Sequence, residues 1–101
     1  MTKKLKIGKR RYKSVKKRMK IKGLFDPDSK TIAVRRGMNK ITEAKTLLHE
    51  ILHGIIHEYA PEVTTETEEH RYIYPLERGL AEYARHNPVE WLLMCIRLAR
   101  L

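Results

Sequence analysis

The residues best suited to chemistry lie in one short segment, His49-Glu50-Ile51-Leu52-His53. This is the H-E-x-x-H pattern, in which two imidazoles four positions apart project from the same face of a helix and can bind one metal ion. Glu50 lies beside them in the helical projection but points away from the ion, so it can accept a proton from metal-bound water. We therefore predict a Zn²⁺ site with His49 and His53 as ligands and Glu50 as the general base of a hydrolase.

A catalytic zinc ion needs a third protein ligand beyond two histidines. The sequence favours Glu77, which falls on the apolar side of the following helix, where an unpaired carboxylate would be costly. His70 is the rival and Glu69 a weaker one, because either faces the site if that helix begins earlier and Pro75 only kinks it. The third ligand is therefore predicted to be Glu77, with His70 and Glu69 left as alternatives.

Peptide hydrolysis also needs a group that stabilises the negative charge developing on the carbonyl oxygen of the substrate. Three tyrosines, Tyr72, Tyr74 and Tyr83, could donate this hydrogen bond, and the sequence does not choose among them. For Tyr83 we expect core packing instead.

The helix that carries the motif is the clearest element of secondary structure. Apolar residues recur at three- and four-residue spacing from about Ile41 until Pro61, which cannot continue a helix. The apolar arc is wide, so we expect this helix to be buried on most sides. A second helix is predicted to have Pro75 in its first turn, after an acidic loop over residues 61–70. Asn87-Pro88 predicts an N-cap followed by a last helix, in which Cys95 is expected to be buried.

The first forty residues are predicted to form short strands with lysines on the solvent side. Polar and apolar residues alternate in several short runs, and Asp26-Pro27-Asp28-Ser29 has the composition of a turn. The runs are Leu5–Ile7, Tyr12–Lys16, Met19–Ile21 and Thr31–Val34. We therefore expect an α+β fold, in which a small antiparallel N-terminal sheet packs on the motif helix and two further C-terminal helices.

Length and charge suggest one domain with two unlike halves. The chain has 101 residues, so a single domain over 1–101 is expected, with a basic β region over 1–40 and a helical region over 41–101 that carries the metal site. The net charge is +10, and residues 1–40 hold sixteen Lys and Arg against two acidic residues. Such an asymmetry can mark a surface that binds a polyanion, so nucleic acid is a possible partner of residues 3–22.

Several classes of protein are disfavoured by the composition. A single cysteine, Cys95, excludes an intramolecular disulfide and a four-cysteine zinc site. The longest apolar run, Trp91–Ile96, is far too short to span a membrane. Residues 1–20 are basic but have no apolar stretch, so a secretory signal is not expected. These features predict a cytoplasmic protein, and they leave the oligomeric state open.

The run Thr46–Gly54 resembles the active-site helix of small zincin-like metallopeptidases from phage and prophage genomes, which are distantly similar to the ImmA/IrrE and SprT-like families. Further segments are similar too, although each is weak by itself: Lys6-Ile7-Gly8, the Tyr12–Val15 strand, Thr31-Ile32, Leu76–Leu80 and Asn87-Pro88. The resemblance implies a minimal zincin fold, zinc bound by His49 and His53, and Glu50 as the catalytic acid/base acting on a protein or peptide substrate. Relatives often carry acidic residues around the position of His70.

The sequence thus supports two functions of different classes. The first is a zinc-dependent metallopeptidase that hydrolyses peptide bonds. The alternative is a basic DNA-associated protein in which the zinc site is structural or vestigial.

Overall fold

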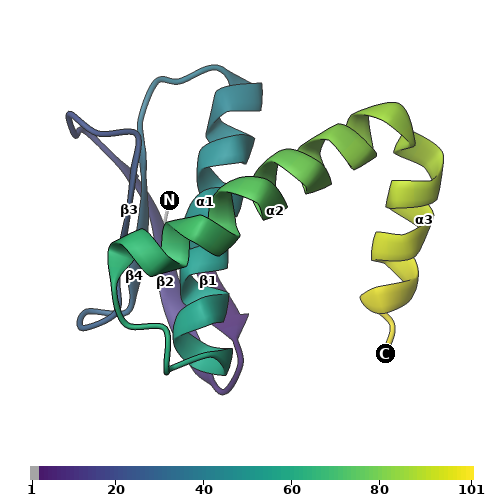
Figure 1. The fold of residues 1–101 in the computed structure, drawn as a ribbon. Coiled ribbons are helices and arrows are strands. Elements are labelled where there is room, and N and C mark those ends of the chain that lie inside the picture. The colour runs from purple at the N-terminus through teal and green to yellow at the C-terminus, as the bar shows by residue number, and fades with distance from the viewer. Residues whose placement is uncertain (1–2) are drawn as a thin grey trace.

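The computed structural model describes residues 3–101, which form a four-stranded sheet followed by three helices (Figure 1). The strands and helices are β1 (Lys3–Ile7), β2 (Arg10–Lys17), β3 (Gly23–Asp26), β4 (Thr31–Arg35), α1 (Lys40–Tyr59), α2 (Glu66–His86) and α3 (Pro88–Leu98). The expected α+β architecture, with a small N-terminal sheet and C-terminal helices, is confirmed.

The sheet is mixed, whereas the sequence predicted only antiparallel pairing. Its strand order is β1-β2-β4-β3, and the central pair β2–β4 is parallel, with Ser14 opposite Ile32. The other two pairs, β1–β2 and β3–β4, are antiparallel. The difference arises because Met19–Ile21 does not form a strand. This segment instead carries the chain to the far edge of the sheet, where β3 pairs with β4.

The core lies between the sheet and α1. Ile7, Tyr12 and Ile32 are buried together, and partly buried apolar side chains from β1, β3 and α1 pack against them: Leu5, Phe25, Leu47 and Ile51. Exposed lysine and arginine side chains flank Tyr12 along β2, as the alternating pattern predicted. Burial of this apolar face fixes α1 on the sheet and thereby fixes the direction in which the motif residues point.

The helix α1 begins and ends as the sequence predicted. The Asn39 side chain caps it by accepting a hydrogen bond from the backbone N–H of Thr42 at 2.9 Å, and the helix stops at Tyr59, two residues before Pro61. The expectation that α1 is buried on most sides is wrong, because Ile41 and Ile55 are 71% and 39% exposed. One face lies against the sheet, and the side towards α2 carries the histidines.

The helix α2 begins nine residues before Pro75, so the prediction that Pro75 lies in its first turn is wrong. The hydroxyl of Thr65 accepts a hydrogen bond from the backbone N–H of Glu68 at 3.2 Å, and three glutamates in the first turn interact favourably with the helix dipole. Pro75 is exposed within the helix, where it removes one backbone donor. The segment predicted as an acidic loop therefore contributes its last five residues to α2.

The last helix, α3, begins at Pro88 as predicted, but Asn87 does not cap it through its side chain. The amide of Asn87 instead donates a hydrogen bond to the carbonyl oxygen of Tyr83, near the end of α2. Among the elements described, α3 packs only against α2, and Cys95 is half-buried rather than buried. Within residues 3–101, no helix has both the length and the apolar character needed to span a membrane.

Candidate metal centre

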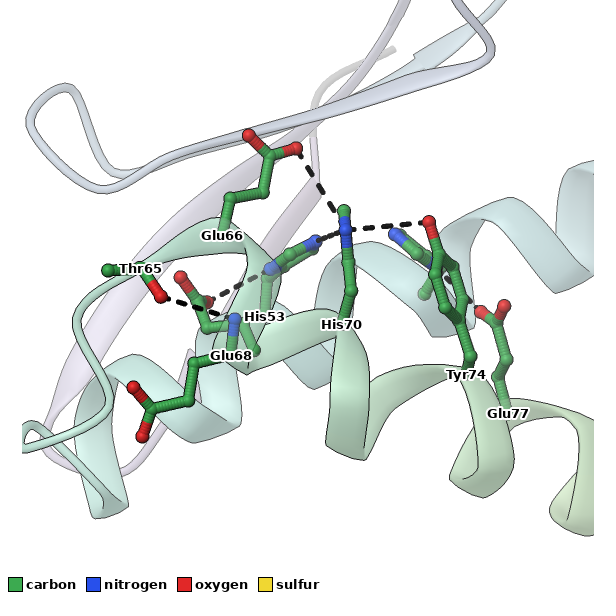
Figure 2. Close-up of polar contacts among 9 residues, drawn as sticks. His53, Thr65, Glu66, Glu68, His70, Tyr74 and Glu77 are labelled. Atoms are coloured by element: carbon green, nitrogen blue, oxygen red, sulfur yellow. Dashed lines mark hydrogen bonds and ion pairs between the residues drawn. The ribbon is translucent and has the colours of Figure 1, made fainter.

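Three imidazoles converge between α1 and α2. His49 and His53 come from α1 and His70 comes from α2, and one ring nitrogen of each lies within 4.8 Å of the other two. Figure 2 shows the rings of His53 and His70 facing each other across the space between the two helices. Three imidazole nitrogens are a donor set that suits zinc and leaves a fourth position open.

The nitrogen–nitrogen distance between His53 and His70 is close to that of two ligands of one ion. His49 and His53 lie one helical turn apart, and their ring centroids are separated by 4.9 Å. The Nε2 atoms of His53 and His70 are 3.1 Å apart. Two nitrogen ligands of a tetrahedral zinc ion lie about 3.3 Å apart, given Zn–N bonds of about 2.0–2.1 Å. The separation of the His53 and His70 nitrogens therefore matches that of two ligands of one ion, and a nitrogen of His49 lies within 4.8 Å of both.

Two carboxylates orient the rings that α1 contributes. Nδ1 of His49 lies 2.7 Å from Oε2 of Glu77, and Nδ1 of His53 lies 3.0 Å from Oε1 of Glu69. A carboxylate can only accept, so we assign the proton to Nδ1 in both rings, which leaves the lone pair of each Nε2 free. Carboxylate–histidine pairs of this kind fix the tautomer and raise the basicity of a metal ligand.

The structure places the candidates for the third ligand in different positions. His70, the alternative, joins His49 and His53, whereas Glu77 contacts the Nδ1 side of His49 and lies outside the three-residue group. Glu69 likewise contacts the Nδ1 side of His53. Each glutamate is thus placed to hold a ring rather than to complete the group of three nitrogens.

The ring of His70 is itself held by two neighbours on α2. The hydroxyl of Tyr74 lies 3.4 Å from Nδ1 of His70, and the two rings stack with their centroids 4.7 Å apart. A carboxylate oxygen of Glu66 lies 4.0 Å from Nε2 of the same histidine (Figure 2). With Nδ1 directed at the tyrosine, Nε2 of His70 faces His53.

Glu50 is buried beside the histidine group, with only 6% of its surface exposed. The side chain packs against Gly23 at the start of β3, where an added Cβ would lie 2.7 Å from Oε2 of Glu50 and 2.6 Å from Cγ2 of Thr46. Burial raises the pKa of Glu50 to about 6, the charge of His49 opposes this rise, and Glu77 and Glu66 add to it. A carboxylate with a pKa near neutrality is suited to accept and return a proton.

Of the three tyrosines considered from the sequence, Tyr74 is the one at the metal centre. The ring of Tyr83 packs edge-on against Trp91 on α3, with centroids 6.2 Å apart, but Tyr83 is 46% exposed, so the core packing expected for it is wrong. Tyr72 is half exposed on α2. The hydroxyl of Tyr74 is the one within reach of His70.

Sequence reasoning missed two features of this centre. The first is that Glu69 and Glu77 are hydrogen-bond partners of histidines. Their spacing could have indicated this, because a helix that begins before Pro75 places the following residues on one face: Glu66, Glu69, His70, Ile73 and Glu77. The second is the contact of Gly23 with Glu50, because the two residues are brought together only by the packing of β3 on α1.

Comparisons with known proteins identify no relative. No family model matches this chain, and searches among curated proteins and solved structures found no significant match. The resemblance to zincin-like peptidases therefore rests on the motif residues themselves.

Proposed function

We propose that this protein is a zinc-dependent metallopeptidase in which His49, His53 and His70 bind the ion. The observation that carries the proposal is the convergence of these three imidazoles beside a buried glutamate, Glu50, on the H-E-x-x-H helix. His70 replaces Glu77 as the proposed third ligand, since its nitrogen lies with the other two. A zinc ion held in this way supplies Lewis acidity, which polarises a peptide carbonyl and lowers the pKa of a coordinated water towards 7.

The proposed roles of the protein side chains follow from their positions. Glu50 accepts a proton from the attacking water and returns it to the leaving amine. Glu77 and Glu69 keep the Nε2 lone pairs of His49 and His53 directed at the ion. The hydroxyl of Tyr74 is the nearest tyrosine donor for the charge that develops on the substrate oxygen.

The decisive experiment combines metal analysis with cleavage. The full chain, purified without a histidine tag, is expected to contain about one zinc ion per molecule, as a site with three protein ligands should. Incubation with a proteome-derived peptide library should generate new peptide termini, detected by mass spectrometry. Removal of zinc with a chelator should abolish their formation, and added Zn²⁺ should restore it.

Glu50→Gln provides the matched control, because it keeps the size of the side chain and removes the proton acceptor. This variant should retain its zinc and generate no new termini. A parent protein that binds no zinc, or new termini that persist in Glu50→Gln, would contradict the proposal. Zinc binding without any cleavage would instead favour the alternative of a DNA-associated protein with a structural ion.

A further inference from the structure

A groove with strongly basic walls reaches the proposed metal centre at His49 and Glu50. The groove has a volume of about 1490 Å³ and contains His49, Glu50 and Glu77 in its lining. Its lining comes from the β2–β3 connection, the N-terminal half of α1 and the C-terminal half of α2, with Gly23 and Arg35 from the sheet. A molecule bound in this groove would therefore lie directly against the proposed catalytic glutamate.

Charge in the groove is unbalanced in favour of cations from three separate elements. Its exposed cationic side chains come from the β2–β3 connection, from α1 and from α2, and they are Lys20, Lys22, Lys40, Lys45, Arg78 and Arg85. Glu82 is the exposed acidic residue in the lining, because Glu50 is buried and Glu77 pairs with His49. Clefts lined by one sign of charge concentrate ligands of the opposite sign.

The rest of the lining is aliphatic. Ile21 and Ile41 are 56% and 71% exposed, and both lie in the groove together with Leu48. Among the described residues, the lining of the groove includes no Phe, Tyr or Trp side chain, and its one aromatic ring is that of His49. Single-stranded nucleic acids are held by basic grooves in which aromatic rings stack on the bases, so this lining suits a peptide better than a nucleic acid.

We propose, on the basis of the peptidase function above, that the substrates are peptide segments rich in acidic and aliphatic residues. Acidic side chains pair with the lysines and arginines of the groove, and aliphatic side chains cover Ile21 and Ile41. Cations on both walls, on α1 and on α2, engage acidic residues along the bound segment. Charge complementarity thus selects which segment lies against Glu50.

The test measures binding separately from cleavage. Zinc-loaded Glu50→Gln, which should hold a peptide without cutting it, is titrated with fluorescent peptides of one length and one aliphatic pattern that carry Glu, Gln or Lys at the remaining positions. The Glu peptide should bind at least about tenfold more tightly than the Lys peptide. Reversal of two groove charges, Lys22→Glu with Lys45→Glu, should remove this preference.

A matched control changes the net charge of the protein by the same amount on β1, the edge strand opposite β3. Lys4→Glu with Lys6→Glu alters exposed residues of β1, which lie outside the groove, and should leave the preference intact at physiological salt, where exposed charges are screened beyond about 8 Å. Equal affinity for the Glu and Lys peptides would overturn the proposal. So would a loss of preference in the control as large as in the groove variant.

Three further outcomes separate this proposal from its rival and from the peptidase function. If a single-stranded oligonucleotide binds through Lys22 and Lys45 and the Glu peptide does not bind, the occupant is nucleic acid and the proposal is wrong. If the parent cleaves Glu and Lys peptides with the same kcat/KM, the charge preference fails while the peptidase function stands. If the Glu peptide binds in the groove and the parent does not cleave it, an acidic peptide is the occupant of the groove and the peptidase function is wrong.

Discussion

The carboxylate of Glu77 accepts a hydrogen bond from Nδ1 of His49 at 2.7 Å, and Glu77 is not a member of the group that His49 forms with His53 and His70. Glu77 is therefore placed to orient the ring of His49 rather than to bind the proposed ion itself. It also distinguishes Glu77, the residue favoured from the sequence, from His70, whose nitrogen lies among the other two.

Zinc affinity should report this difference. Glu77→Gln keeps an oxygen acceptor but loses the charge, and we expect zinc affinity to fall by about 10–100-fold, as is usual when an outer partner of a ligand is changed. His70→Ala removes a proposed ligand and should cost more than Glu77→Gln. Competition with a chromophoric chelator measures both, and a larger loss in Glu77→Gln than in His70→Ala would return Glu77 to the role of ligand.

Glu50→Gln should separate activity from stability. Loss of the proton acceptor is expected to lower kcat by about 10²–10⁴-fold. The same change replaces a buried carboxylate, whose charged form is disfavoured by desolvation, with a neutral amide. The metal-free variant should therefore unfold at a urea concentration no lower than the parent. A marked fall in that midpoint would show that the carboxylate stabilises the fold.

A methyl group at Gly23 should disturb Glu50 without touching the ion. In Gly23→Ala the new Cβ would overlap Thr46 and Glu50, so we expect kcat to fall while the zinc content stays at the level of the parent. Gly79→Ala is the matched control, because an added Cβ meets nothing within 4 Å there. That control should keep full activity and gain about 0.5–1 kcal/mol in stability as an alanine within a helix.

The hydroxyl of Tyr74 should matter to turnover more than to metal binding. Tyr74→Phe retains the ring that stacks on His70 and removes the donor at 3.4 Å. If this hydroxyl stabilises the developing oxyanion, kcat should fall by about 10²–10³-fold, with a small change in KM. Unchanged kcat in Tyr74→Phe would assign the oxyanion donor elsewhere.

Stability at alkaline pH should depend on one buried pair. Tyr12 donates a hydrogen bond to Glu58, which also pairs with Arg10 at 3.3 Å, and burial together with Glu58 raises the pKa of Tyr12 from 10.0 to about 12. Because folding favours the neutral phenol, this contribution to stability is complete below about pH 10 and is lost as the pH rises from 10 to 12.

Tyr12→Phe isolates this effect from the titration of the many lysines. The variant should be less stable than the parent by about 1–2 kcal/mol at pH 7, because Glu58 loses a hydrogen bond. The difference in the free energy of unfolding should shrink between pH 10 and 12. Urea unfolding across this range is the measurement, and a difference that stays constant with pH would refute the coupling.

The parts of the molecule that could be read from the sequence are those set by local rules. The helix α1 follows from its apolar spacing and from Pro61, and the pairing of the two motif histidines follows from the helical repeat. The parallel pairing of β2 with β4 is set by packing rather than by local pattern, because both strands alternate in the same way in either direction.

The third ligand was harder to predict because it depended on where α2 begins. Pro75 suggested a helix start, whereas the cap at Thr65 and the acidic first turn extend the helix backwards past it. That extension brings His70 opposite His53 and places Glu77, about two turns further along α2, opposite His49. The N-cap at Thr65 thus determines that His70 lies within α2 and faces His53.

The proposed metal ligands and the residues that surround the proposed proton acceptor, Glu50, come from different parts of the chain. The three imidazoles and both of their carboxylate partners lie between residues 49 and 77, in one helix–loop–helix unit. The surroundings of Glu50 include Gly23, which arrives from the sheet. If the proposed function holds, a change in β3 should alter the proton acceptor while leaving the three imidazoles in place.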